Sequence, residues 1–255
     1  MINFKELNNK KIIVTGSSTG IGFETAIQFL NLNAKVVFHG NKSMQNLEKK
    51  IKNKSKSKKY HIIQSDFSNI DNIQKFIKKS VLFLGGLDIL VNNAGTMVGR
   101  YNLTDMQNED FNNIFNLNAK SVYFLIKHSL KEFKKNKEGC IINVSTISAK
   151  SGGSVGSSVY ASSKAFVSSL TRSLVSELSS YNIRINAISP GTINTKFHQQ
   201  YSTKEKLEKT KNLIPMKRLG KSSDCVGPII FLSMKSLSGY ITGQVIEVNG
   251  GQFFN

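Results

Sequence analysis

Short, almost continuously apolar runs alternate along the chain with longer stretches of mixed polarity. Seven of these runs are candidate β-strands: residues 12–15, 35–39, 61–64, 87–91, 140–144, 184–188 and 244–248. Unbroken apolar runs of this length are typical of strands in a parallel sheet that is covered on both faces. The pattern therefore predicts a buried parallel sheet.

The stretches between the runs have the apolar spacing of helices that bury one face. The clearest examples are residues 22–32, 70–84, 110–135 and 159–181. This alternation predicts an α/β fold, a doubly wound parallel (Rossmann) sheet of about seven strands with helices on both faces. Right-handed crossovers bring the carboxyl ends of such strands to one edge of the sheet, where we expect ligands to bind.

No linker or internal repeat divides this pattern, so we expect residues 1–255 to form a single domain. Residues 195–213 (TKFHQQYSTKEKLEKTKNL) are polar and helical in pattern, with few positions that suit a core. We interpret this segment as a mobile cover over a substrate within that domain.

The first strand runs directly into a glycine-rich segment, residues 15–22 (TGSSTGIG), which opens a predicted helix. Glycines there permit a tight turn, let backbone N–H groups approach a pyrophosphate, and let the helix pack closely on the sheet. The helix N-terminus adds a partial positive charge. A glycine-rich turn alone is common, but its place between strand and helix predicts dinucleotide binding.

Further motifs follow in a fixed order. They are Asp66 in QSDFSN, the NNAG of residues 92–95, Asn118 in NLNAKS, the YASSK of residues 160–164, Pro190-Gly191 followed by residues 192–195, Leu219-Gly220, and the final SGYITGQVIEVNGG. Together with TGSSTGIG, this set resembles the short-chain dehydrogenase/reductase family over essentially the whole chain. Within that family, the chain looks most like the 3-oxoacyl carrier-protein reductase type and allied small alcohol or sugar dehydrogenases.

The resemblance implies an NAD(P)-dependent oxidoreductase that transfers hydride between nicotinamide and a ketone or secondary alcohol. It also implies a homotetramer, formed through the helices at 110–135 and 159–181 and the C-terminal strand region. The implied cofactor-binding residues are Gly16, Ser18, Thr19, Gly20, Ile21, Gly22, Asn41, Lys42, Asp66, Asn92, Ala94, Gly95, Tyr160, Lys164, Pro190, Gly191, Ile193 and Thr195. Among these, Asp66 would contact the adenine.

Tyr160 and Lys164 are four residues apart and would share one face of a helix. A free tyrosine has a pKa of about 10 and exchanges protons poorly near neutrality. We expect the Lys164 ammonium and the positive oxidised nicotinamide to lower the pKa of Tyr160, so that it acts as general acid and base. The resemblance adds that Lys164 holds the nicotinamide ribose and that Asn118 orders a water relay.

A serine usually follows the fifth strand in this family and hydrogen-bonds the substrate oxygen. Here the strand ends Asn143-Val144-Ser145-Thr146, and the aligned position is Thr146. Threonine carries the same hydroxyl donor, so polarisation of a carbonyl can survive. We favour Thr146 over Ser145 for this role, and either Ser145 or Ser148 could take it if the strand end is shifted.

The cofactor prediction comes from the end of the second strand, Phe38-His39-Gly40-Asn41-Lys42. A reader of the ribose 2′-OH there would be Asp or Glu, but the aligned position is Gly40. The lack of an acid and the presence of Lys42 permit a 2′-phosphate. We therefore expect NADP, with NAD not excluded.

The chain contains 35 Lys and Arg against 16 Asp and Glu, a formal net charge of +19. The densest run, residues 49–59 (KKIKNKSKSKK), has no aromatic residue of the kind that single-strand nucleic-acid binders use. We interpret it as a solvated helix end and loop, with an anion-attracting patch as the alternative. No nucleic-acid partner is expected, although the positive charge suits an acidic carrier protein.

No apolar run reaches the roughly 18–20 residues that a membrane helix needs. Residues 1–11 carry charges but no apolar segment of a secretory signal. Cys140 and Cys225 lie far apart, and the four histidines show no ligand spacing, so neither a disulfide nor a metal site is expected. Both cysteines are interpreted as small core residues, and a cytoplasmic location is predicted.

Three alternatives remain open at the level of sequence. The first is another sugar or small-alcohol dehydrogenase of the same family. The second is a non-catalytic, dinucleotide-binding regulatory protein, suggested by Thr146 and the high charge, although a sensor has no need to keep Asn118, Tyr160 and Lys164 together. The third is a nucleic-acid binder that uses residues 49–59.

Overall fold

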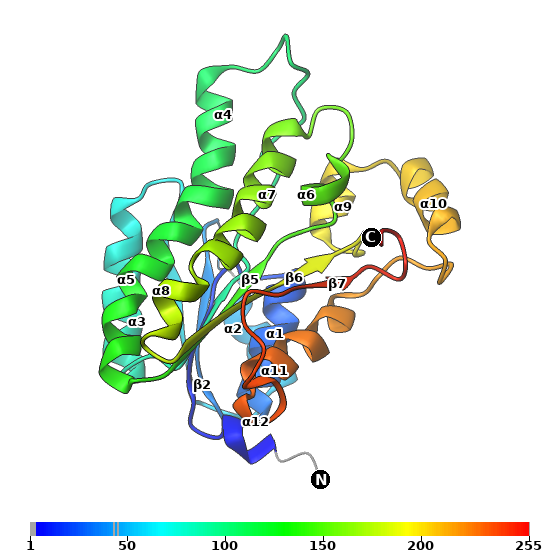
Figure 1. Ribbon diagram of the computed structural model, residues 1–255. Helices are drawn as coiled ribbons and strands as arrows, with labels where there is room; N and C mark the ends of the chain where they lie inside the picture. Colours follow the sequence, from blue (N-terminus) through cyan, green and yellow to red (C-terminus); the bar gives the residue numbers. More distant parts are fainter. Residues whose placement is uncertain (1–3, 43, 45, 255) are drawn as a thin grey trace.

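Seven parallel strands form the centre of the computed structural model (Figure 1), which describes residues 4–42, 44 and 46–254. Their order in the sheet is β3-β2-β1-β4-β5-β6-β7. The strands are β1 Lys11–Val14, β2 Lys35–Gly40, β3 Tyr60–Gln64, β4 Ile89–Asn92, β5 Gly139–Val144, β6 Ile183–Pro190 and β7 Val245–Val248. Each overlaps one of the seven predicted runs, so the predicted Rossmann-type sheet is confirmed.

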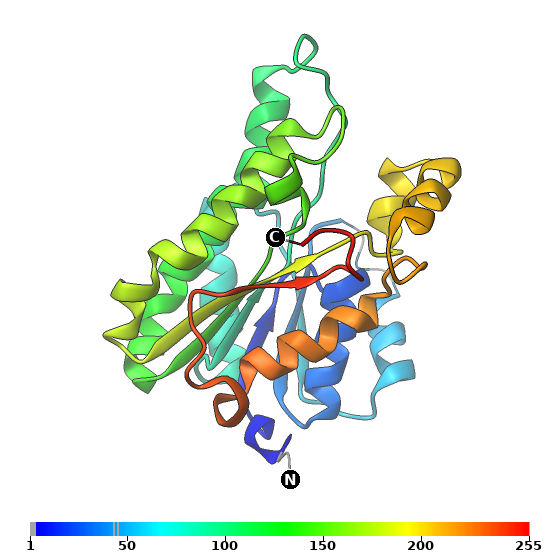
Figure 2. The same ribbon diagram turned by 45° about the vertical axis from the view of Figure 1, so that its right-hand side comes forward.

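Helices cover both faces of the sheet (Figure 2). The helices and short helical turns are Phe4–Leu7, α1 Gly20–Asn31, α2 Leu47–Lys54, α3 Asp71–Leu84, α4 Asn108–Phe115, the π-helical turn Asn116–Lys120, α5 Ser121–Asn136, α6 Ser148–Ser151, α7 Ser158–Ser173, α8 Val175–Ser179, α9 Lys196–Tyr201, α10 Lys204–Leu213, Ser222–Cys225, α11 Val226–Ser233 and α12 Lys235–Ser238. Successive residues of a strand point to opposite faces of the sheet and so belong to two separate hydrophobic cores. Ile12 and Val14 pack with α1 and α11, whereas Ile13 packs with α3, α5 and α7.

The pairing of β1 shows why chemistry gathers at one edge of the sheet. Val14 is aligned with Phe38 of β2 on one side and with Val91 of β4 on the other. The chain departs from β1 in opposite directions across the sheet, and this reversal creates a crevice at the carboxyl ends of the strands. The loops after β1, β4, β5 and β6 all open into that crevice.

The predicted helix at 110–135 is present, but it contains a feature that the apolar spacing did not reveal. Between α4 and α5 the chain forms the π-helical turn Asn116–Lys120, which includes Asn118. Single π-helical turns within α-helices are frequent at functional sites because the extra residue turns side chains out of the normal register.

The predicted cover, residues 195–213, forms α9 and α10 beside the carboxyl edge of the sheet (Figure 1). The lysine-rich run 49–59 comprises the last turns of α2 and an exposed loop, as predicted. Of the segment 1–11, residues 1–3 lie outside the described part of the chain, and Phe4–Leu7 form one short helical turn. No helix among the described residues has the length and apolar character needed to cross a membrane.

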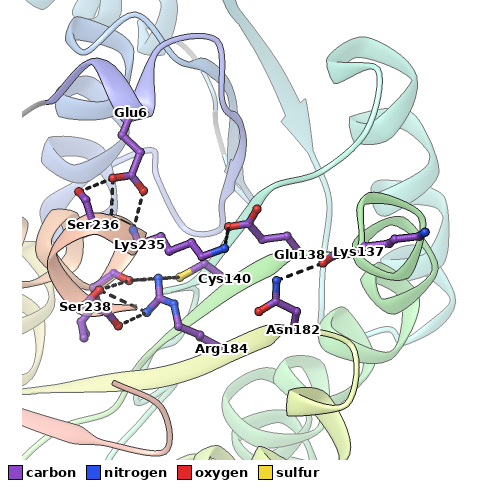
Figure 3. Close-up of polar contacts among 10 residues, drawn as sticks. Glu6, Lys137, Glu138, Cys140, Asn182, Arg184, Lys235, Ser236 and Ser238 are labelled. Carbon is purple, nitrogen blue, oxygen red and sulfur yellow. Dashed lines mark hydrogen bonds and ion pairs between the residues drawn. The ribbon is translucent and has the colours of Figure 1, made fainter. Parts of the chain in front are cut away.

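A polar cluster ties the C-terminal helices to the opposite, amino edge of the sheet (Figure 3). The Arg184 guanidinium donates to the backbone oxygens of Leu232 and Ser238, at 2.8 and 3.1 Å. Glu6 accepts hydrogen bonds from the backbone N–H groups of Lys235 and Ser236 at the start of α12. The first described turn of the chain is thereby fixed to one of the last helices.

Both cysteines are buried free thiols, as the sequence predicted. Cys140 packs in the core beneath Arg184, and burial raises the pKa of its thiol to about 11. Burial raises the pKa of the Cys225 thiol to about 12.

Candidate active site

A cavity of about 380 Å³ opens at the carboxyl edge of the sheet. It lies between the glycine-rich turn after β1, the loops after β4, β5 and β6, and the two helices α9 and α10. The predicted site residues that line it are Gly16, Thr19, Gly20, Ile21, Ala94, Gly95, Ser145, Thr146, Tyr160, Lys164, Pro190, Gly191, Ile193 and Thr195. The topology thus brings together residues from four separate loops and from α7.

The glycine-rich turn is fixed against the end of β4. Thr15 Oγ1 accepts hydrogen bonds from the backbone N–H groups of Asn93 and Ala94, both at 3.0 Å. The Asn93 side chain donates to the Thr15 and Gly16 carbonyls at 2.9 and 3.0 Å. Gly16 has a φ of +62°, and a Cβ there would lie 2.7 Å from Ala94 Cα. Only glycine fits both the backbone conformation and this close approach.

A buried histidine supports the turn from the other side. His39, at the end of β2, accepts from the Gly16 N–H through Nδ1 at 2.9 Å, and its Nε2 lies 3.0 Å from the Ser65 carbonyl. Its ring stacks on Phe67 with centroids 4.0 Å apart. Burial lowers the pKa of His39 to about 4, so the imidazole is neutral at pH 7. The two bonds assign the proton to Nε2.

Tyr160 and Lys164 lie on one face of α7 and both line the cavity, as their spacing predicted. The Lys164 ammonium donates to the Val144 carbonyl at 2.8 Å. The Tyr160 hydroxyl has no hydrogen-bond partner among the described residues, and its ring lies 5.6 Å from that of Phe197. The phenol therefore has its polar atom free to meet a ligand.

Lys164 does not by itself lower the pKa of Tyr160, contrary to the expectation from the sequence. Burial raises the pKa of Tyr160 above its ordinary value, and burial lowers the pKa of Lys164 to about 8. The ammonium hydrogen-bonds Val144 rather than the phenol, so its attraction does not offset the desolvation of the phenolate. In this structure Tyr160 is a neutral phenol, which is the form that donates a proton.

The two candidate hydroxyls after β5 differ in their surroundings. Ser145 Oγ is buried against α7, where it lies 3.2 Å from the Lys164 carbonyl and 2.7 Å from Ser168 Oγ. Thr146 Oγ1 accepts one bond from the Ser148 N–H at 3.3 Å, and its own proton remains available. The geometry favours Thr146 over Ser145 as a donor into the cavity.

Asn118 is fully buried in the π-helical turn, behind the cavity wall. Its Nδ2 donates to the Thr96 and Ile114 carbonyls, both at 2.8 Å, and its Oδ1 accepts from the Thr96 N–H at 3.0 Å. A Cβ at Gly95 would lie 2.6 Å from Asn118 Oδ1 and 3.1 Å from Lys164 Nζ. The absence of a side chain at residue 95 lets the strand end approach both residues.

Other predicted cofactor residues lie outside the cavity. Asn41, Lys42 and Asp66 gather beyond the ends of β2 and β3, where hydrogen bonds from Ser68 and Asn41 and the charge of Lys42 hold the pKa of Asp66 low despite partial burial. Ser18 and Gly22 belong to the turn itself. Asn92 is different, because its side chain donates to Asn143 Oδ1 inside the sheet at 2.9 Å.

β2 itself ends without an acidic residue, and the carboxylate that interacts with Lys42 is that of Asp66, which follows β3. A Cβ at Gly40 would lie 2.6 Å from Met44 Sδ and 3.0 Å from the Ser18 side chain, so these two residues occupy the space that a longer side chain would need. The turn, the backbone approach at Gly16 and the buried cation Lys164 fit a dinucleotide. No Asp or Glu is found among the described residues that line the cavity, which suits a ligand with a pyrophosphate.

Sequence reasoning missed several residues that shape the site. His39 lies outside the sequence motifs, and the motifs that contain Thr15 and Asn93 do not reveal the hydrogen bonds that these two residues form. On the cover, Tyr201 Oη lies 3.0 Å from Thr96 Oγ1, and Phe197 covers Tyr160. No group of three or more His, Cys, Asp or Glu that could hold a metal ion occurs in the described part of the chain.

Comparisons with known proteins agree with this architecture. A family model described as enoyl-(acyl carrier protein) reductase matches residues 16–252. A 3-oxoacyl-[acyl-carrier-protein] reductase from Thermotoga maritima is 33% identical over 96% of this chain and 98% of its own. A 2-dehydro-3-deoxy-D-gluconate 5-dehydrogenase from Escherichia coli is 32% identical over 96% of each chain. The solved structure of the NADH-dependent reductase A1-R' complexed with NAD superposes with a TM-score of 0.86 at 29% identity, covering 99% of this chain and 100% of that one.

Proposed function

The chain belongs to the short-chain dehydrogenase/reductase family and is an oxidoreductase, and from that premise we propose which residues carry the reaction. The observation that supports the assignment best concerns the Tyr160 phenol, whose hydroxyl has no hydrogen-bond partner in the described part of the chain. Tyr160 lines a cavity together with Thr146, Lys164 and the glycine-rich turn. A nicotinamide cofactor supplies or accepts the hydride in this family. The protein's part is to position the carbonyl and to handle its proton.

In the proposed reduction, the substrate carbonyl oxygen lies between Tyr160 and Thr146. Thr146 Oγ1 donates a hydrogen bond that polarises the carbonyl, and Tyr160 Oη donates the proton to the alkoxide as it forms. Lys164 keeps two N–H donors after its bond to Val144, and these would hold the nicotinamide ribose. Asn118 supports the wall behind Lys164 and links the site to a water relay. Alcohol oxidation runs the same steps in reverse.

Replacement of Tyr160 by Phe tests this assignment. The variant keeps the ring against Phe197 but loses the hydroxyl that transfers the proton in the proposed mechanism. We expect turnover to fall by at least about a thousandfold while the dissociation constant of the cofactor changes little. Full activity of Tyr160→Phe would remove Tyr160 as the acid. Tight NADPH binding by the wild type with no turnover of any carbonyl would instead favour the regulatory alternative.

We propose that the cofactor is NADP rather than NAD. The supporting observation is that β2 ends in Gly40 without a carboxylate, while Lys42 follows two residues later. A carboxylate there would repel a 2′-phosphate, and Lys42 can pair with it. Fluorescence titration of both reduced cofactors tests this choice, and a lower dissociation constant for NADH would overturn it.

Two classes of substrate fit the relatives. One is a 3-oxoacyl group on a carrier protein, the substrate named for the Thermotoga maritima reductase. The net charge of +19 would attract such a carrier protein if it is acidic. The other is a small keto sugar acid or related ketone, as in the Escherichia coli dehydrogenase. In both cases residues 1–255 act as one dinucleotide-binding and catalytic domain, with residues 195–213 as its movable cover.

We further propose a homotetramer in the cytoplasm. The tetramer is supported by aromatic side chains left exposed on α4, α5 and α7, namely Phe111, Tyr123 and Phe166. The location is supported by the two free thiols, because cysteines of proteins in oxidising compartments are usually paired.

A further inference from the structure

The cavity wall is charged with one sign only. Its described lining residues include Arg100, Lys164, Lys196 and Lys206, together with His198, but no Asp or Glu. Lys164 lies beside Tyr160, whereas the other four groups lie at the end of the cavity formed by the cover and by the loop after β4. A pyrophosphate bound at the glycine-rich turn does not account for an excess of cations at this other end of the cavity.

Arg100 is held in place by the cover and by the loop before α7. Its Nε donates to the Tyr201 carbonyl at 2.9 Å, and its Nη1 donates to Ser154 Oγ and to the Val155 carbonyl, both at 2.9 Å. Nη2 is not used in any of these bonds. Three hydrogen bonds fix the guanidinium plane, and one edge of its donor fork is left for a ligand.

Lys206 of α10 reaches the same serine. Its Nζ lies 3.2 Å from Ser154 Oγ, the oxygen that also accepts from Arg100. Two cationic nitrogens thus lie within hydrogen-bond distance of one hydroxyl, although like charges repel. Burial and the positive charge of Arg100 both lower the pKa of Lys206. Burial, together with the charges of Arg100 and Lys206, lowers the pKa of the adjacent His198 to about 4.

A general surplus of lysine does not explain this arrangement. Other lysines of the cover pair with carboxylates of the same helix: Lys209 with Glu205 at 2.8 Å, and Lys211 with Glu208 at 2.7 Å. Among the described residues, neither Arg100 nor Lys206 forms an ion pair with an acid. Both acids of α10 therefore pair with exposed lysines of the same helix, whereas Arg100 and Lys206, which line the cavity, have no acid partner among the described residues.

We propose that the substrate is a small ketone bearing a carboxylate, and that Arg100 and Lys206 bind this carboxylate while Tyr160 meets the carbonyl. The inference rests on the proposed reduction at Tyr160 and narrows its substrate class. A carboxylate would accept from Arg100 Nη2 and Lys206 Nζ and relieve the repulsion between them. It would also tie the cover to the loop after β4, so that substrate binding and closure of the cover are coupled.

The test uses oxo acids paired with their primary amides, which have nearly the same shape but no charge. The series 3-oxobutanoate, 4-oxopentanoate and 5-oxohexanoate, each with its amide, samples the distance between carbonyl and carboxylate. For the best acid we expect kcat/KM at least tenfold above that of its amide, with the difference mainly in KM. In Lys206→Met and Arg100→Met, the preference for the acid over its amide should fall about tenfold or more, because kcat/KM for the acid falls further than kcat/KM for the amide.

The matched control is Lys209→Met, which removes one charge from the same helix outside the cavity and should keep the preference. Equal loss on acid and amide in Lys206→Met and Arg100→Met would mean that the two residues only support the cover, and would overturn the proposal. So would a wild type that prefers the amides.

A second arm separates this proposal from the reaction itself. Calorimetric titration of the NADP-saturated protein with each acid and amide measures binding without turnover. Tighter binding of the acid that disappears in Lys206→Met would sustain the anion site even if no carbonyl were reduced, in which case the proposed function alone fails. If 3-oxobutanoyl pantetheine 4′-phosphate is preferred over its dephosphorylated form and no oxo acid is preferred over its amide, the cations bind a carrier-arm phosphate and the carboxylate proposal is wrong.

Discussion

Burial sets the protonation states of the two residues at the centre of the site. A phenolate or an ammonium surrounded by protein loses its hydration, so the pKa of Tyr160 rises and that of Lys164 falls to about 8. A neutral phenol is the proton donor that carbonyl reduction needs. The reverse reaction needs additional positive charge near Tyr160, which an oxidised nicotinamide carries.

The hydroxyl of Thr146 can be separated experimentally from that of Ser145. Thr146→Val removes the free donor at constant size, and we expect kcat to fall by about 10²–10³-fold, as for loss of one donor to a developing oxyanion. Thr146→Ser should retain kcat within a few-fold. Ser145→Ala should instead cost on the order of 1–2 kcal/mol of stability, because it loses contacts to α7, with little change in kcat. Steady-state kinetics and urea unfolding check the three variants, and a kcat loss confined to Ser145→Ala would reverse the assignment.

His39 should make the protein sensitive to acid. The pKa of His39 is about 4 in the folded protein, compared with 6.5 for an ordinary histidine. Between these two pH values His39 is protonated in the unfolded chain but stays neutral in the native state. Stability is therefore lost as the pH falls from about 6.5 to about 4, by an amount on the order of 3 kcal/mol. Asp66, the charged neighbour, acts in the opposite direction by attracting that proton.

The measurement is urea unfolding of the wild type and of His39→Gln at pH 7 and pH 4. A glutamine side chain cannot be protonated in this range, so the wild type should lose more unfolding free energy over this interval than the variant does. Equal losses in the two proteins would show that His39 is not the group responsible.

At the residue scale, sequence reasoning succeeded where a motif fixes the spacing and failed where contacts are made across the fold. Tyr160 and Lys164 are one helical turn apart, so their common face follows from periodicity alone. The bond from Gly16 to His39 joins residues 23 positions apart, and no local pattern reports it. The raised pKa of Tyr160 likewise depends on burial, which the motif does not contain.

At the scale of elements, the glycine-rich turn is held in place because its backbone is hydrogen-bonded to the ends of both β2 and β4. Gly16→Ala forces an L-residue into a left-handed conformation, which costs about 1–2 kcal/mol, and also drives a methyl group into the Ala94 backbone. We expect a larger loss of stability than this strain alone and a loss of cofactor affinity of at least tenfold. Thermal unfolding and fluorescence titration with NADPH measure the two effects.

Gly85, which ends α3, provides the matched control. Its φ is +75°, and a Cβ there meets no atom within 4 Å. Gly85→Ala should therefore show the conformational strain without any effect on the cofactor. Equal cofactor affinity in Gly16→Ala and the wild type would mean that close approach at the turn is not required.

Element boundaries show how far hydrophobic spacing can be taken. The helix predicted at 110–135 exists, but the π-helical turn Asn116–Lys120 inside it was not predicted, because one extra residue in a turn barely alters the apolar pattern. This turn carries Asn118, whose three hydrogen bonds depend on it. The helical cover is predictable from its polar composition, whereas the contacts that Thr96 and Arg100 make with Tyr201 of the cover arise only from the tertiary structure.

On the scale of the whole molecule, the uncovered aromatic residues point to self-association. Phe111 and Phe115 of α4 stack with centroids 6.1 Å apart, and Phe115 meets Phe166 of α7 at 5.9 Å. Exposed aromatic clusters of this kind are typical of protein interfaces. The sheet itself was predictable because each strand coincides with an apolar run, whereas contacts between copies of a chain leave no comparable pattern in its sequence.

We expect the wild type to sediment as a tetramer at micromolar concentration. The double substitution Phe111→Ser, Phe166→Ser should shift it to smaller species, because the apolar area that drives association is removed. Leu82→Ser on α3, which removes an exposed apolar side chain elsewhere, should leave the tetramer intact. A wild-type monomer under these conditions would contradict the prediction.

The placement of the two cysteines has a practical consequence. Because Cys140 and Cys225 are buried and their thiols resist ionisation, a thiol reagent such as iodoacetamide can reach them only when the surrounding core opens. The rate of alkylation therefore reports how often the native state opens, with Cys140 sampling the amino edge of the sheet and Cys225 the helical layer beside α11. Protection by a bound ligand would appear as slower labelling, so the wild-type chain contains its own probe for ligand screening.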